Sequence, residues 1–183
     1  MKTFYKARMI SLFLLFFTNG IQAQTTDTKP DQIIQLPQLS LEQKLDRSVR
    51  NTTGRDIAGI AYAKSLGKTP EDFGKYIGEH TAFFWADIKG KGSVLFVQYL
   101  YRFLQTDRNS KMEIQSVSEK SVKAKMTVYG ETNIKALADL NVTIEEYASF
   151  YGKYLETLAE YLGLEYKQKF DDGWIVFSVT EKK

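Results

Sequence analysis

His80 is the first candidate for acid–base chemistry, because it is the single imidazole in a chain of 183 residues that contains no cysteine. One histidine and no thiol exclude a cysteine nucleophile, a disulfide framework and a multi-histidine metal centre. Tyr76 and Phe84 lie one turn to either side of it on the apolar face of a predicted helix. Two interpretations stay open. In the first, His80 acts in a pocket as a general base, a haem ligand or a hydrogen-bond donor. In the second, it is a partly buried core histidine that is hydrogen-bonded to a carbonyl or a tyrosine hydroxyl.

Three pairs of neighbouring carboxylates each have a local structural role. The pairs at 71–72 and 145–146 fall in the first turns of predicted helices, where acidic side chains interact with the helix dipole, and the pair at 171–172 belongs to a turn. A glycosidase acid and base usually come from distant elements that converge in a cleft. Nucleotide-binding glycine motifs and a nucleophile elbow are absent. The sequence therefore predicts no cofactor and no metal.

Tyrosines are the most distinctive chemical feature, in a chain whose aromatic content is 14%. On the predicted helix 144–162, a tyrosine stripe repeats at spacings of three and four; it consists of Ile144, Tyr147, Tyr151, Tyr154, Leu158 and Tyr161. A buried tyrosine hydroxyl needs a hydrogen-bond partner. The stripe thus indicates either an amphipathic cavity with rings as walls, or an ordinary core whose hydroxyls reach the surface. We predict a ligand pocket lined by Tyr76, His80, Phe84, Tyr147, Tyr151 and Trp174.

The first 23 residues predict a secretory signal peptide of bacterial type. Lys2, Lys6 and Arg8 precede an apolar run at 9–18, and Ala23 offers the cleavage site. The run is about ten residues long, too short to cross a bilayer of roughly 30 Å as a helix. We therefore expect a secreted or periplasmic protein with no stable membrane anchor.

Loss of this leader would leave a chain of balanced charge. Three of the 25 Lys and Arg residues lie in the leader and none of the 22 Asp and Glu, so 22 cations remain against 22 acids. A neutral, mixed surface gives no electrostatic footprint for nucleic acid. The partner that we expect is a small apolar or aromatic molecule, with nucleic acid excluded.

The chain after the leader divides into a flexible linker at 24–39 and a single domain at 40–183. The linker is polar and holds two of the three prolines. Capping signals and apolar periodicity predict helices over 40–49, 53–67, 70–88, 133–140 and 144–162. The run at 93–105 is apolar on almost all sides, so periodicity alone cannot distinguish a buried helix from a buried strand. Its thirteen residues favour a helix.

Strands are predicted where the apolar period changes to two. The first hairpin covers 112–117 and 122–129, and the second joins 165–170 to 174–180 through an Asp-Gly turn. Alternation of apolar and polar residues is typical of antiparallel strands with one solvated face. The predicted fold class is α+β, with a four-stranded antiparallel sheet packed against several helices in the order ααα(α)-ββ-αα-ββ.

This element order resembles that of the L-2-amino-thiazoline-4-carboxylic acid hydrolases and the 4-vinyl reductase ligand-binding domains, over roughly 54–180. The tail is the most similar part: a long helix, Gly163, a strand, an acidic turn and the aromatic strand WIVFSV. The resemblance implies an antiparallel sheet flanked by helices, with a small-molecule pocket. Those families carry cysteines after the first hairpin and in the last one, whereas 128–130 and 172–174 have none here. No site residue and no hydrolase activity can therefore be transferred.

Three functional hypotheses follow. The first is a secreted or periplasmic, non-enzymatic module that binds a small apolar or aromatic ligand between the helices and the sheet. The second is a hydrolase-like enzyme on the same scaffold, with His80 as its base. The third is a partner-binding or homodimeric protein, in which the tyrosine-rich helix 144–162 packs against another chain.

Overall fold

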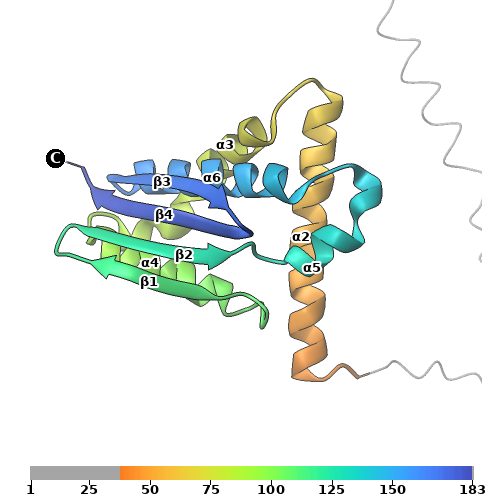
Figure 1. Ribbon diagram of the computed structural model, residues 1–183, viewed down its shortest axis with the longest axis horizontal. Coiled ribbons are helices and arrows are strands. Elements are labelled where there is room, and N and C mark those ends of the chain that lie inside the picture. The colour runs from red at the N-terminus through yellow and green to blue at the C-terminus, as the bar shows by residue number, and fades with distance from the viewer. Residues whose placement is uncertain (1–37, 183) are drawn as a thin grey trace, which may run out of the picture. The chain divides into compact units, whose positions relative to one another are not determined.

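The structure, a computed structural model, describes residues 38–182. The predicted signal peptide and positions 24–37 of the predicted linker lie outside this range. The described residues form an α+β fold, with helices and one four-stranded antiparallel sheet in the predicted order of elements (Figure 1). The fold-class prediction is therefore confirmed.

Two hairpins meet edge to edge to make the sheet. Its strands are β1 (Met112–Val117), β2 (Ser121–Thr127), β3 (Leu164–Asp171) and β4 (Trp174–Glu181), in the spatial order β1-β2-β4-β3. On the central strands alternate side chains are buried, as the period of two predicted. These are Val122, Ala124, Met126, Ile175, Phe177 and Val179.

The turn between β3 and β4 follows from its sequence. Asp172 and Gly173 both have positive φ, at 47° and 77°. Two consecutive left-handed residues define the type I′ turn, which matches the twist of a two-residue hairpin and favours Asp-Gly. The predicted hairpin is confirmed.

The described residues include seven helical segments besides the sheet. The α-helices are α2 (Leu41–Ser65), α3 (Pro70–Thr81), α4 (Gly92–Leu104), α5 (Glu131–Ala136) and α6 (Ile144–Tyr161), and the short 3₁₀ segments are η1 (Ala82–Ile88) and η2 (Ala138–Leu140). Complete capping boxes begin α2, α3 and α6 at Ser40, Thr69 and Thr143. Each capping side chain accepts a hydrogen bond from a backbone N–H that the helix leaves unpaired, which explains why these three starts were predictable.

Four helix predictions were wrong in their limits. The short helix predicted at 133–140 is α5 followed by the 3₁₀ segment η2. The predicted helices 40–49 and 53–67 are one continuous helix, α2, because Thr53 packs fully buried instead of capping a new start, and Gly54 stays within the helix. Tertiary packing on that face outweighs the weak helix propensity of Thr-Gly. The predicted helix 70–88 changes to a 3₁₀ turn at Ala82. The apolar run at 93–105 is a helix, as favoured.

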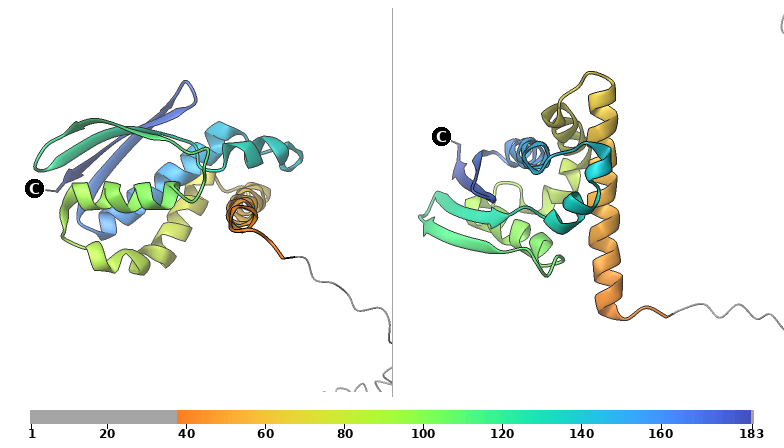
Figure 2. Two further views of the ribbon diagram at one scale, coloured as in Figure 1. Left: turned by 90° about the horizontal axis from the view of Figure 1, so that it is seen from below. Right: turned by 45° about the vertical axis from the view of Figure 1, so that its right-hand side comes forward.

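The helices lie in two layers against one face of the sheet. Seen from below, α4 and α6 lie directly against the strands, and α3 with η1 lies beyond them (Figure 2, left). Helix α2 runs along the side of this stack, next to α5 (Figure 1). The core fills the space between the sheet and the first helical layer and includes Phe96, Leu100, Leu155 and Leu158, each 0% or 1% exposed.

Helices α3 and α6 approach each other closely at two glycines. A Cβ atom at Gly74 would lie 2.3 Å from the carbonyl oxygen of Phe150, and one at Gly78 would lie 2.7 Å from the Thr157 Cβ. Real Cβ atoms do not approach other atoms so closely, so both positions need glycine. This contact holds α3 in place and thereby one wall of the groove described below.

Candidate functional site

The six residues predicted to line one pocket lie in three different places. Tyr76, His80 and Phe84 are exposed on α3 and η1, and Tyr147 and Tyr151 are buried on α6. Trp174 begins β4 on the sheet face that turns away from the helices, where the Lys125 ammonium lies 4.3 Å from its ring centroid. The structure therefore does not bring these six side chains to one pocket between the helices and the sheet.

His80 lies on the solvent side of α3. Its ring nitrogen Nδ1 lies 2.8 Å from the Tyr76 carbonyl oxygen, one turn earlier, and its ring lies 4.3 Å from the Tyr76 ring. The expected bond to a carbonyl is present, but the side chain is exposed and not partly buried. Within the described residues, no Asp or Glu forms an ion pair with His80. The base-and-orienting-acid arrangement typical of a hydrolase is thus not formed around it.

The tyrosine stripe of α6 meets the core of its own chain. Tyr147 is 0% exposed and Tyr151 4%, and their rings stack 6.5 Å apart. Phe103 of α4 also stacks against Tyr151, with centroids 6.5 Å apart. The stripe behaves as a packed core whose rings contact other rings. Such burial leaves this part of the stripe no open face for a second chain.

An open apolar groove lies between the end of α2 and the start of α3. It has a volume of about 500 Å³ and is lined by Tyr62, Ala63, Leu66, Lys68, Asp72, Phe73 and Tyr76. Tyr62 is 67% exposed, Leu66 60% and Tyr76 56%. Of the six predicted site residues, Tyr76 alone is among these. Large apolar side chains gathered at an open hollow are the usual mark of a binding surface.

Local sequence signals build the two walls of this groove. Helix α2 ends before Gly67, whose φ of 72° suits glycine, and the Thr69 capping box then starts α3 in a new direction. The floor is the ring of Phe73, which lies so close to Gly59 that a Cβ there would be 2.3 Å from it. Phe73 in turn stacks on Phe150 of α6, with ring centroids 5.3 Å apart. The floor is therefore anchored to the core.

Two further aromatic side chains are exposed on η1, the segment that continues α3. Phe83 is 60% exposed and Phe84 72%, with their ring centroids 4.0 Å apart. Phe84 is a predicted site residue, but it is not among the residues that line the groove. We define the groove site as the seven lining residues alone.

Asp56 is a partly buried acid that the sequence analysis did not single out. It lies on the middle of α2, and its Oδ2 accepts a hydrogen bond of 3.2 Å from the hydroxyl of Tyr147. Burial raises the pKa of its carboxyl from 3.8 to about 6, although the Tyr147 bond and the nearby Arg55 charge act to lower that pKa. Thr53, one turn earlier, is also buried, and its hydroxyl has no hydrogen-bond partner.

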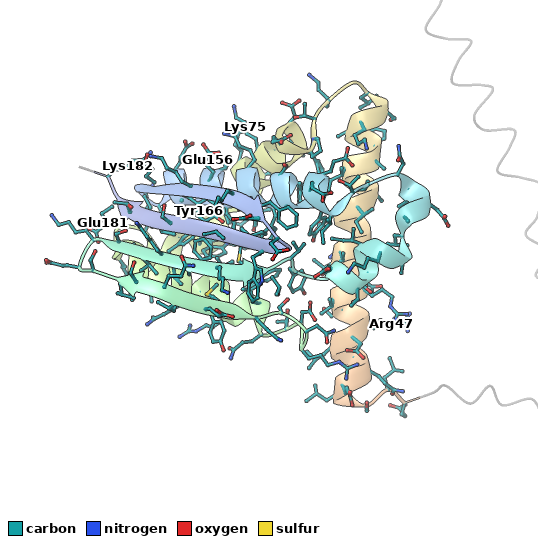
Figure 3. All side chains as sticks on the ribbon, in the orientation of Figure 1. Arg47, Lys75, Glu156, Tyr166, Glu181 and Lys182 are labelled. Carbon is teal, nitrogen blue, oxygen red and sulfur yellow. The ribbon has the colours of Figure 1, made fainter. Side chains whose placement is uncertain are left out.

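A second hollow differs from the groove because most of its lining residues are charged. It has a volume of about 550 Å³ and lies where α6 meets β3 and the end of β4; its lining is Glu156, Glu160, Glu165, Tyr166, Lys167, Thr180, Glu181 and Lys182. Figure 3 labels four of these side chains: Glu156, Tyr166, Glu181 and Lys182. Among the described residues, no three His, Cys, Asp or Glu side chains are grouped to hold a metal ion.

No helix of the described chain is both long enough and apolar enough to cross a membrane. Comparison with known proteins gives no further lead: no family model, no curated protein and no solved structure matches this chain.

Proposed function

We propose that this protein is a non-enzymatic binding module, secreted or periplasmic, that takes up a small apolar or aromatic molecule in the groove between α2 and α3. The observation that carries the proposal is the open groove of about 500 Å³ with three aromatic rings and a leucine in its lining. This volume falls in the range of roughly 300–1,000 Å³ that is usual for small-molecule sites.

The chemistry of the lining supports an apolar or aromatic ligand. Tyr62 and Leu66 are both more than half exposed, so a ligand that covers them would remove apolar surface from water. The Phe73 ring on the floor offers a flat surface for stacking. Lys68 and Asp72 are the two charged residues of the lining. The Asp72 carboxylate already accepts the Thr69 N–H in the capping box of α3, so Lys68 is the charged side chain that can orient a polar end of the ligand.

The test is a fluorescence titration with N-phenyl-1-naphthylamine, an uncharged aromatic probe that brightens in apolar surroundings. In the double variant Tyr62→Ser/Leu66→Ser we expect the affinity for the probe to fall about tenfold or more. Each substitution removes an apolar contact worth about 1 kcal/mol, and 1.4 kcal/mol corresponds to a factor of ten.

The matched control is Val94→Ser/Tyr101→Ser, which removes the same kinds of side chain from α4. Those two residues are 40% and 45% exposed and do not line the groove. The control should bind the probe as the unmodified protein does. Equal binding by all three proteins, or loss of binding in the α4 variant alone, would refute the proposed site.

A further inference from the structure

The side of α2 that faces solvent carries a continuous stripe of exposed residues. Its positions repeat at spacings of three and four, so they fall within a sector of about 80° around the helix axis. In Figure 3 the Arg47 side chain extends from α2 on the side turned away from the sheet. We call this set the outer stripe; it consists of Lys44, Arg47, Asn51, Arg55, Ala58 and Tyr62.

The charges of α2 are segregated around its axis, although the total charge of the chain is nearly balanced. The charged residues of the outer stripe are Lys44, Arg47 and Arg55, and all are cationic. Within the described residues, no Asp or Glu forms an ion pair with any of them. The acids of α2, at 42, 46 and 56, lie on roughly the opposite side of the helix. There, two of them pair with Arg108 and the third accepts the hydrogen bond from Tyr147.

The helix surface around Arg55 is open and hollowed. A hollow of about 630 Å³ is lined by residues of α2 alone, and its lining combines the cations Arg50 and Arg55 with the small residues Gly54 and Ala58. Arginine binds phosphate oxygens through paired N–H donors. The hollow therefore gives an anionic head group room to approach two guanidinium groups.

The outer stripe ends at aromatic and apolar side chains. Tyr62 is exposed, and so is Leu66, one turn later. A soluble acidic chain offers nothing that would cover these two side chains. At the head-group level of a membrane, by contrast, tyrosine and leucine commonly lie beside lysine and arginine. The combination favours a lipid surface over a soluble polyanion.

We propose that the outer stripe of α2 docks the protein reversibly on an anionic lipid surface. The three cations face the lipid phosphates, and Tyr62 and Leu66 enter the head-group layer. From Lys44 to Tyr62 the stripe is about 27 Å long. It follows a straight helix at the side of the protein, which suits a flat partner (Figure 1).

A consequence for the groove rests on the proposed function. Tyr62 and Leu66 also line the groove, so docking brings the opening of the groove to the lipid surface. An apolar molecule then reaches the groove from the lipid without crossing water.

The test is co-sedimentation of the full chain, exported and purified from a bacterial host, with lipid vesicles. Phosphatidylcholine vesicles that contain about 30% phosphatidylglycerol should bind the protein at least about tenfold more tightly than vesicles of phosphatidylcholine alone. Raising the NaCl concentration from about 0.1 M to about 1 M should weaken binding to the anionic vesicles by a similar factor, because the Debye length falls from about 10 Å to about 3 Å.

The variant Lys44→Gln/Arg47→Gln/Arg55→Gln removes the three cations of the outer stripe. Each cation close to an anionic surface contributes about fivefold to binding, so the variant should bind the anionic vesicles about a hundredfold more weakly. None of the three residues lines the groove. The variant should therefore bind the naphthylamine probe normally without vesicles, which distinguishes failure of docking from failure of the groove site.

The matched control is Lys123→Gln/Lys167→Gln/Lys169→Gln, which makes the same change in net charge on the open face of the sheet. It should bind the anionic vesicles nearly as the unmodified protein does. Docking through the outer stripe is refuted by equal binding to both kinds of vesicle, by unchanged binding of the α2 variant, or by an equal loss in the control. Binding to labelled poly-L-glutamate at least as tight as binding to the vesicles would also refute it, and would assign the stripe to a soluble acidic partner.

Discussion

Gly74→Ala is expected to destabilise the protein by about 3 kcal/mol or more. The added methyl group would lie 2.3 Å from the Phe150 carbonyl oxygen and 3.1 Å from both the Phe150 carbonyl carbon and the Tyr154 nitrogen. These are backbone atoms of α6, so no side chain can rotate to make room, and α3 must move away. The free energy of unfolding, measured by urea denaturation monitored by circular dichroism, checks this expectation.

The matched control for this substitution is Gly54→Ala in α2. A Cβ there meets one atom at 3.9 Å, which is ordinary van der Waals contact. Because alanine stabilises a helix interior relative to glycine, this variant should gain about 0.5–1 kcal/mol. Equal stability of the two variants would show that α3 and α6 are not in the close contact described.

Asp107→Ala is expected to have the second large effect, a loss of about 3 kcal/mol. Asp107 is 7% exposed, and its carboxylate accepts three hydrogen bonds: from the Asn109 N–H at 3.0 Å, the Ser110 hydroxyl at 3.0 Å and the Gly130 N–H at 2.9 Å. The last bond joins the loop before β1 to the loop after β2. Alanine would leave the buried Gly130 N–H without a partner.

The same denaturation measurement with Asp87→Ala provides the control, since that carboxylate is exposed on η1. Its free energy of unfolding should stay within about 0.5 kcal/mol of the unmodified protein. A comparably small change in Asp107→Ala would contradict the assigned role of Asp107 between the two loops.

The elements could be predicted where their signals are local. A capping box such as that of Thr143 with Glu146 satisfies two backbone N–H groups within four residues, and the Asp172-Gly173 pair defines its own turn. The helix break predicted near Thr53 is absent from the structure, because a contact with a residue distant in sequence keeps α2 continuous. Thr53 packs against Gly130, where a Cβ would lie 2.1 Å from the threonine hydroxyl oxygen. No pattern within a short window contains that contact.

The candidate site was harder to predict, for two physical reasons. Aromatic residues at helical spacing serve a core and a cavity equally well, so the stripe containing Tyr147 gave no means to choose between them. The groove also depends on how α2 and α3 diverge after Gly67, which is a tertiary property. One signal was present but unused. In β4, Ile175, Phe177 and Val179 alternate as the buried set, which places Trp174 on the opposite face.

Asp56 shows a similar limit. In the sequence it reads as an acid in the first turn of a helix expected to begin near 53. Once α2 is continuous, Asp56 lies four residues before Ile60 on a face that packs against α6, and its role changes from capping to a partly buried hydrogen bond with Tyr147. Because a helix start was wrongly predicted near 53, the contact between Asp56 and Tyr147 was not predicted.

The most direct test of the groove site is a titration of ¹⁵N-labelled protein with N-phenyl-1-naphthylamine, followed by two-dimensional NMR. The account predicts that the largest amide shifts fall at Tyr62, Ala63, Leu66, Phe73 and Tyr76, the apolar residues that line the groove. Shifts concentrated on the open face of the sheet around Trp174, or at the charged hollow beside Glu156, would contradict it, as would a spectrum that the probe leaves unchanged.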